Sequence, residues 1–228
     1  MKNFVLLLFS FICLQSSAQL DETQTGAWYM LFWNTQIKDG PWGFQGDVQY
    51  RNWNIIGDLE QLLLRGGLTY TPKNSVVKLT LGYANISTGV FGDSDAKSFE
   101  SRIYQEALIP HKAASRLFLT HRFRYEQRFV ETQDFRTRYR YNLFVNIPLN
   151  QKTIEAKTVY LALYNELFVN GQKEVGNDQS VALFDRNRFY SALGYAISKD
   201  LKTQVGLMRQ STDNWSKNQL QLSLHANF

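Results

Sequence analysis

The sequence contains few of the residues on which catalytic and metal sites usually depend. Its 228 residues include one cysteine, four prolines and three histidines. Cys13 lies in an N-terminal segment that we expect to be removed, so the remaining chain has no disulfide, no zinc–thiolate site and no cysteine nucleophile. Neither G-x-G-x-x-G nor G-x-x-x-x-G-K-S/T occurs, which leaves nucleotide binding without support.

The sequence also lacks an obvious membrane-spanning helix. The N-terminal apolar run, Phe4 to Leu14, has 11 residues, whereas a helix needs about 20 to cross a bilayer. The run follows the basic Lys2 and precedes the small residues 16–18, an order that predicts a secretory signal peptide over residues 1–18. The alternative is a buried N-terminal helix. It is disfavoured because the run is followed by a polar segment and not by a helix cap. Residues 19–228 then form one domain.

The charge of the chain is only mildly positive. Without Lys2 it has 24 basic and 20 acidic residues, a net charge of +4. No lysine or arginine cluster stands apart from acidic or aromatic neighbours, so we expect no nucleic-acid partner. Aromatic residues make up 14% of the chain, which with the scarcity of proline favours extended strands over helices or disorder.

Apolar and polar residues alternate along most of the chain after residue 27. In residues 42–51, for example, apolar or small residues hold the even positions and polar residues hold the odd ones. Since successive side chains of a strand point to opposite faces, such a segment has one apolar face and one polar face. About eleven segments of roughly 11–15 residues show this pattern, and tilted membrane-crossing strands need about 9–11 residues.

These observations predict an all-β fold, a single closed antiparallel up-and-down transmembrane β-barrel in an outer membrane. The long connections near 86–98 and 170–184 fall on one side, and the shorter ones near 71–75 and 198–200 fall on the other, as in outer-membrane barrels. Single-chain bacterial barrels have an even number of strands. Eleven segments therefore indicate ten or twelve strands, and we favour twelve.

The C-terminal residues alternate up to a terminal phenylalanine. This ending resembles the signature by which bacterial outer-membrane barrels are recognised for insertion, although a soluble strand can also end in phenylalanine. We expect outer-membrane lipid as a partner and the barrel-assembly machinery as a partner during insertion. The signature residues are Leu220, Leu222, Leu224, Ala226 and Phe228.

The polar faces carry an excess of basic residues. Arginine or lysine on a lipid-facing surface costs about 2–4 kcal/mol near the middle of a bilayer, so we expect these residues to face the barrel axis. Arg116, Lys78 and Lys217 are assigned inward as well, together with Asp47 and Asp134. The predicted luminal network comprises Arg51, Arg65, Glu100, Arg102, Glu106, Arg122, Arg124, Glu126, Arg128, Arg136, Arg138, Arg140, Glu166, Arg186 and Arg188.

Two interpretations of this network remain open. It lines a small pore or a site for small anionic solutes, or its arginine–carboxylate pairs simply fill a narrow lumen and brace the wall. Residues 117–129 and 135–147 should pair as antiparallel strands. Their facing arginines would repel one another unless an acid such as Glu126 lies between them.

Aromatic residues near the ends and outer faces of the segments predict girdles at the two membrane interfaces. Amphipathic rings are favoured at that depth. The residues assigned to the girdles are Trp28, Trp33, Trp42, Trp53, Tyr50, Tyr70, Tyr83, Tyr125 and Tyr195.

Seven stretches carry a resemblance to a known family: residues 49–53, 57–65, 102–105, 121–129, 146–150, 165–168 and 184–190. Together they resemble the bacterial family called domain of unknown function 2490. The resemblance covers nearly all of the chain after the signal peptide and implies an outer-membrane barrel. It implies no activity and no functional residues, because none is agreed for the family.

The sequence gives little support for catalysis. Ser223 and His225 share a strand face but lie two residues apart, about 7 Å along a strand, and no strained G-x-S-x-G turn occurs. We therefore predict a non-enzymatic protein with no catalytic residues, no cofactor and no metal. A membrane-embedded lipid-modifying hydrolase is the first alternative. The second is a soluble periplasmic ligand-binding barrel, in which the hydrophobic residues would face inward.

Overall fold

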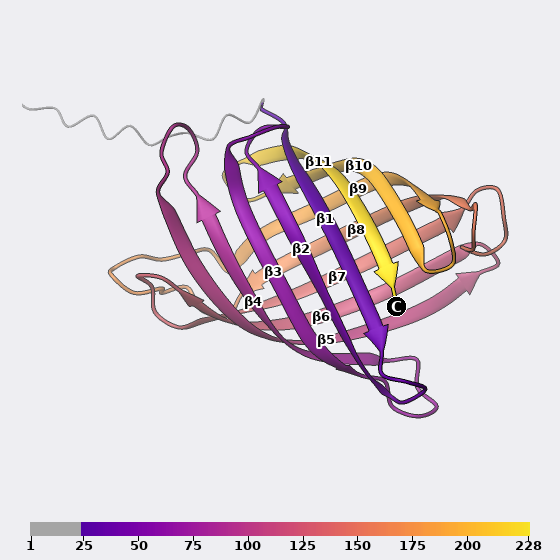
Figure 1. Ribbon diagram of the computed structural model, residues 1–228. Helices are drawn as coiled ribbons and strands as arrows, with labels where there is room; N and C mark the ends of the chain where they lie inside the picture. The colour runs from indigo at the N-terminus through magenta and orange to yellow at the C-terminus, as the bar shows by residue number, and fades with distance from the viewer. Residues whose placement is uncertain (1–23) are drawn as a thin grey trace, which may run out of the picture.

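Eleven β-strands make up the computed structural model, which describes residues 24–228 (Figure 1). The predicted signal peptide lies outside the described residues. No helix in the described part is long and apolar enough to cross a membrane. The strands are β1 (Gly26–Gln36), β2 (Trp42–Asn52), β3 (Leu59–Tyr70), β4 (Lys78–Gly89), β5 (Lys97–Ala114), β6 (Leu117–Val130), β7 (Arg136–Pro148), β8 (Val159–Asn170), β9 (Phe184–Ala196), β10 (Leu201–Ser211) and β11 (Ser216–Asn227).

The strands form one closed barrel. Each strand from β1 to β11 pairs with the next in antiparallel orientation, and β1 closes the sheet against β11 in parallel, from Gly26 opposite Gln219 to Asn34 opposite Asn227. The predicted all-β closed barrel is thus confirmed. Eleven strands lie between the ten and twelve that the sequence indicated, so the favoured count of twelve is wrong, as is antiparallel pairing throughout. With an odd number of up-and-down strands the first and last run in the same direction, so closure requires a parallel pair.

The connections lie at two opposite ends of the barrel. We call the end with residues 53–58, 90–96, 131–135, 171–183 and 212–215 the loop end, and the end with 37–41, 71–77, 115–116, 149–158 and 197–200 the turn end. The predicted long connection at 86–98 is shorter than expected, because β4 extends to Gly89 and β5 begins at Lys97. Phe228 lies at the turn end, and β1 starts at the loop end (Figure 1).

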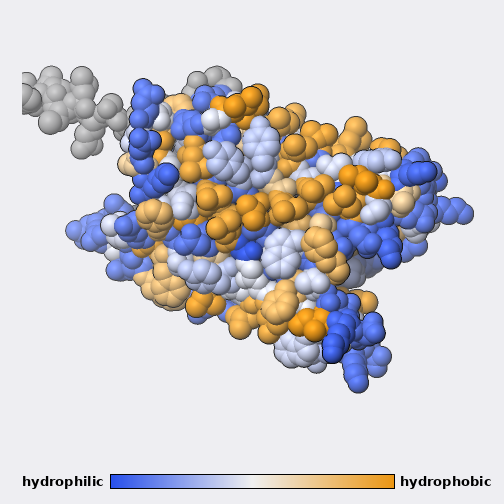
Figure 2. Space-filling view, in the orientation of Figure 1, coloured by the Kyte–Doolittle hydropathy of each residue, from blue (hydrophilic) through white to orange (hydrophobic). Residues whose placement is uncertain are grey.

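Alternation along each strand separates an apolar outer face from a more polar lumen. Large apolar side chains such as Leu81, Phe123 and Tyr139 are exposed on the outside, while the luminal Glu126 and Arg138 are buried. Figure 2 shows hydrophobic side chains across the middle of the barrel wall and hydrophilic ones at both ends. Within residues 24–228 no second layer covers the sheet, so the outward leucines and tyrosines contact the medium around the barrel.

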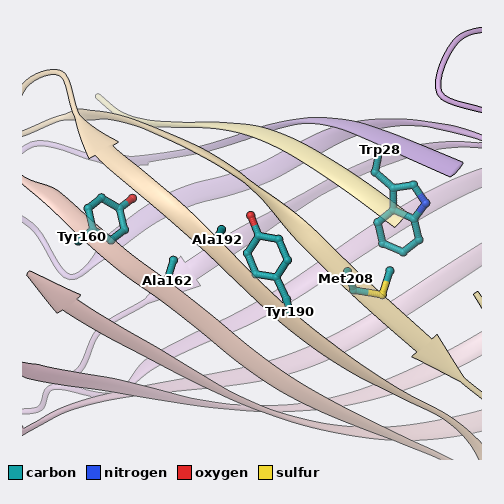
Figure 3. Packing of buried hydrophobic residues seen from close by; sticks show 6 residues of the cluster. All are labelled: Trp28, Tyr160, Ala162, Tyr190, Ala192 and Met208. Atoms are coloured by element: carbon teal, nitrogen blue, oxygen red, sulfur yellow. The ribbon is translucent and has the colours of Figure 1, made fainter. Parts of the chain in front are cut away.

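One side of the lumen is aromatic instead of charged. Trp28, Tyr160, Tyr190 and Met208 pack around two alanines, Ala162 and Ala192, as the close-up in Figure 3 shows. Trp28 is 2% exposed inside the barrel, so its assignment to an outer girdle is wrong. β1 carries large apolar residues on both faces, and alternation therefore gave no basis for choosing the face of Trp28.

Two luminal glycines make room for tyrosine rings of neighbouring strands. Gly194 lies opposite Tyr160 and Gly82 lies opposite Tyr104. A Cβ at Gly194 would stand 2.2 Å from Cζ of Tyr160, and one at Gly82 would stand 2.3 Å from Cζ of Tyr104. The rings thus cover the glycine backbone, a pairing that supports strongly bent sheets.

We expect Gly194→Ala to destabilise the barrel by about 1–3 kcal/mol, the usual cost of inserting a methyl group into a packed interior. Gly66→Ala is the matched control, since a Cβ there would meet no atom within 4 Å. Urea unfolding of the two purified variants measures the difference. Equal unfolding midpoints would show that the Tyr160 ring does not need this space.

Candidate functional site: a luminal charge network above a cavity

Glu126 is the centre of the luminal charge network. It lies opposite Arg138 in the pairing of β6 with β7, and its Oε2 accepts hydrogen bonds from Nε (2.9 Å) and Nη2 (2.6 Å) of Arg138. Its Oε1 accepts from Nη1 of Arg140 at 2.6 Å. Arg102 and Arg124 approach to 3.9 and 3.8 Å. An acid therefore lies between the facing arginines of β6 and β7, and its side chain is 2% exposed.

Two further carboxylates extend the network across β5 to β8. Glu106 accepts from Nε of Arg124 at 2.6 Å, and Nε of Arg122 lies 3.8 Å away. Glu166 accepts from Arg122 and, at 2.8 Å, from Nε of Arg140. Because Arg122 and Arg140 each contact two carboxylates, the ion pairs form a continuous chain from β5 to β8 and not a set of isolated bridges.

The remaining ion pairs lie on either side of this chain. Glu100 accepts a two-pronged pair of bonds from Arg102, both 2.7 Å, and also accepts from Arg128. Asp47 pairs with Arg65 at 2.7 Å. Most of these groups are nine-tenths buried or more. Charged hydrogen bonds of this kind are roughly twice as strong as neutral ones, which offsets part of the cost of burying the charges.

Asp185 is a network residue that the sequence pattern missed. Its carboxylate pairs with Arg138 at 2.8 Å and with Arg186 at 3.0 Å. Strict alternation would place it on the face opposite to Arg186. The pairing of β8 with β9 shifts register between Phe168 and Val169, however, so Asp185 is the extra residue of a bulge. No sequence signal marked that bulge.

Three predicted arginines have no carboxylate within 4 Å among residues 24–228, namely Arg51, Arg136 and Arg188. Arg51 donates to Gln49 and Gln61, and its guanidinium carbon lies 3.8 Å above the Trp28 ring. Arg188 donates from Nε to Gln210 at 2.7 Å and lies 4.7 Å from the same ring. Amides and aromatic faces thus replace acids as the partners of Arg51 and Arg188.

All fifteen residues of the predicted network lie on luminal positions of their strands, although Arg186 is partly exposed near the loop end. Two of the additional assignments are wrong. Arg116 lies in the turn 115–116 and donates to the carbonyl of Leu149, and Asp134 lies in the loop 131–135. Leu220, Leu222, Leu224 and Ala226 share one face of β11, which ends just before Phe228.

A cavity of about 420 Å³ occupies the part of the lumen toward the turn end. It reaches from Trp28, Arg51 and Arg188 to Asn34 and Asn227, the last residues paired between β1 and β11. The network residues nearer the loop end are not part of its lining; these are Glu100, Arg102, Glu126, Arg128, Arg136 and Arg138. The lumen therefore has a half packed with ion pairs and a hollow half.

The lining of the cavity carries a strong excess of positive charge. Eight basic residues face three acids, a net charge of +5 with His225 neutral. The three acids, Asp47, Glu106 and Glu166, are each already paired with an arginine. The basic lining residues are Arg51, Arg65, Lys78, Arg122, Arg124, Arg140, Arg188 and Lys202.

Some buried polar atoms in the cavity wall have no hydrogen-bond partner in the described part of the chain. They include Oη of Tyr190 and Oδ1 of Asn142, both in side chains 2% exposed. Their neighbours are satisfied, since Tyr164 and Gln221 bond each other and Tyr160 accepts from Gln204 at 3.2 Å. These two polar groups in the wall beside the cations are thus left without a partner among residues 24–228.

Ser223 and His225 lie at the turn end of the same cavity. Oγ of Ser223 is 3.0 Å from Nε2 of His225, closer than their spacing along the strand led us to expect. The imidazole stacks on Phe32 with the ring centroids 4.8 Å apart. No ion pair joins His225 to a carboxylate within residues 24–228, and that region contains no cluster of three metal-ligating residues.

The family model described as protein of unknown function (DUF2490) matches residues 25–221. The chain belongs to this family. No curated protein and no solved structure matches the chain. The family match confirms the resemblance seen in the sequence, and it covers ten of the eleven strands in full. The network lies within the matched region, whereas the cavity lining extends beyond it to Ser223, His225, Ala226 and Asn227.

Replacing Glu126 by alanine should destabilise this DUF2490 barrel by about 3–5 kcal/mol, because Arg138 and Arg140 would lose a shared buried counter-charge. Glu174→Ala in the loop 171–183 is the control, since its side chain is exposed. Urea unfolding and heat-modifiability on gels report both variants. Equal behaviour of the two variants would mean that the network does not brace the wall.

Proposed function

We propose that this DUF2490 protein is an integral outer-membrane β-barrel without enzymatic activity, whose lumen is closed by the arginine–carboxylate network. The observation that carries the proposal is the outer face, where large apolar side chains are exposed on every side of the barrel. Soluble monomers rarely expose contiguous apolar patches beyond a few hundred Å². In the acyl-chain region of a membrane the same apolar face contacts lipid and stabilises the barrel.

The second alternative, a soluble ligand-binding barrel, places hydrophobic residues inside. Leucines such as Leu64, Leu81 and Leu207 lie outside and exposed, while buried charges occupy much of the interior. This arrangement counts against the soluble alternative. Outer-membrane barrels carry their long loops on the outside, and the longest connection between strands, residues 171–183, lies at the loop end. We therefore assign the turn end and its cavity to the periplasm and the packed half to the outside.

The ion-pair chain favours a closed barrel over a small pore. Glu126, Arg138 and Arg140 are almost fully buried, and both arginines donate to Glu126. Together with Glu166 and Arg122 they form a chain of ion pairs along the luminal side of β5 to β8, which in our proposal closes the path of a permeating ion. An open pore lined by the same residues would leave their side chains hydrated and accessible. The geometry therefore supports a bracing and binding role.

Leu81→Arg tests the membrane setting of the outer face. Leu81 is 59% exposed in β4, and a lipid-facing arginine costs about 2–4 kcal/mol near the bilayer centre. Ile56→Arg in the loop 53–58 is the control, because Ile56 is already 86% exposed outside the strands. Urea unfolding from phospholipid vesicles compares them. Equal stability of the two variants, or extraction of the wild type without detergent, would contradict the proposal.

The first alternative, a lipid-modifying hydrolase, remains a candidate function. The hydrogen bond between Ser223 and His225 favours it. A serine nucleophile needs a base in hydrogen-bond contact and a third group that orients the imidazole. Phe32 stacks on that imidazole and Lys202 lies opposite it on β10, so the surroundings do not supply an acid. We therefore rank this candidate below the non-enzymatic barrel.

A fluorophosphonate probe distinguishes the two candidates, because it labels activated serines covalently. The non-enzymatic proposal predicts no labelling of the wild type above the level of Ser223→Ala. Ser191→Ala is a further control, since Ser191 is exposed on the outer face of β9. Labelling that Ser223→Ala abolishes and Ser191→Ala leaves unchanged would establish the hydrolase instead.

A further inference from the structure

We propose that the cavity at the turn end binds a small amphipathic carboxylate, an anion with one carboxylate and an aromatic or short acyl body. The inference rests on the proposed function, which places the cavity at the periplasmic side of an inserted barrel. Four independent features of the cavity wall carry it: its charge, the arrangement of two guanidinium groups, its apolar surface and an unpartnered hydroxyl.

The positive charge of the cavity lining favours the binding of an anion. The lining has a net charge of +5, or +4 when Glu126, which pairs with the lining residue Arg140, is included, and its three carboxylates are already paired with arginines. Arg51, Arg188, Lys78 and Lys202 have no carboxylate within 4 Å among residues 24–228. Unpaired positive charges repel one another strongly where the wall is of low polarity. A bound anion removes that repulsion.

Arg188 marks where the carboxylate binds. Arg51 adds positive charge beside it, since Nε, Nη1 and Nη2 of Arg51 already donate to Gln49 and Gln61. Both guanidinium groups lie on the ring of Trp28, at 3.8 and 4.7 Å from its centroid. The hydrogen bond of Arg188 to Gln210 uses Nε. Glu60 lies near but accepts from Nε1 of Trp28 and from Gln219. A planar guanidinium matches a carboxylate with two parallel hydrogen bonds, a geometry that a lysine ammonium lacks.

The apolar surface beside these cations fits the body of the ligand. Tyr164 and Tyr190 stack with their centroids 4.7 Å apart, and Met30 and Ile154 pack against the same cluster. Figure 3 shows the rings of Tyr160 and Tyr190 projecting from neighbouring strands into one space, with Trp28 beyond them. A flat or short apolar group gains burial and ring contacts there.

The hydroxyl of Tyr190 supplies a further donor. It is buried in the cavity wall without a hydrogen-bond partner in residues 24–228. Tyr190 lies two residues from Arg188 on the same face of β9, so its hydroxyl and the guanidinium project on the same side. A buried hydroxyl without a partner is unfavourable, and a ligand carboxylate beside Arg188 accepts from it.

Fluorine NMR of the full-length barrel in nanodiscs tests the inference with 4-(trifluoromethyl)benzoate as the probe. We expect saturable binding of this anion and none of the uncharged 4-(trifluoromethyl)benzyl alcohol. Arg188→Gln should weaken binding by about tenfold or more, the effect of losing a charged hydrogen bond. Tyr190→Phe should weaken it by about two- to tenfold while leaving the urea midpoint unchanged or higher, because the hydroxyl has no partner to lose.

Arg136→Gln is the matched control. Arg136 is luminal and buried and has no carboxylate within 4 Å among the described residues, but it is not part of the cavity lining. Its removal should change affinity by less than about twofold. Absence of saturable binding, equal binding of the alcohol, or equal losses in Arg136→Gln and Arg188→Gln would overturn the inference. Failure of the wild type to insert, read by heat-modifiability of the same sample, would overturn the proposed function instead.

Discussion

The sharing of buried carboxylates between arginines is the interaction on which the rest of this barrel depends. A closed sheet with an apolar exterior leaves its polar side chains no place but the lumen, and the lumen of eleven strands is narrow. Burying a single ion costs several kcal/mol unless its partners are well placed. Glu126 and Glu166 meet that condition because each contacts at least two arginines. The wall is thereby tied together across β6, β7 and β8.

The network also divides the lumen. Where acids are available, from β5 to β8, ion pairs pack the interior. β1 and β10 carry no acid, and β9 carries one, Asp185, near the loop end. Along the rest of this side Trp28, Tyr190 and Met208 fill the lumen. Arg51 and Arg188 lie at the border, bound to amides and to the ring of Trp28. This border is where positive charge is left over and where the cavity begins.

Much of the fold could be predicted from the sequence, because a period of two carries the information. In β6 and β7 arginines alternate with aromatic residues, and this alternation predicts which side chains face inward. The same rule gave no answer for Trp28, since both faces of β1 are apolar. It gave the wrong face for Asp185, because a bulge adds one residue at that point. The parallel closure of β1 on β11 pairs strands about 190 residues apart, and no local pattern encodes it.

The candidate site was less accessible to sequence reasoning. Counting charges indicated an arginine-rich interior but not which arginines lack an acid, since that depends on register between strands. The Ser223–His225 contact depends on side-chain conformation, and the cavity depends on where large residues are absent. Neither the contact nor the cavity can be inferred from the spacing of residues along the chain.

Ion conductance of the wild-type protein across a planar lipid bilayer tests the central claim most directly. A lumen closed by shared arginine–carboxylate pairs predicts that the inserted barrel gives no resolved conductance steps. Stable steps from the folded, inserted protein, with a reversal potential that shows passage of anions, would contradict it.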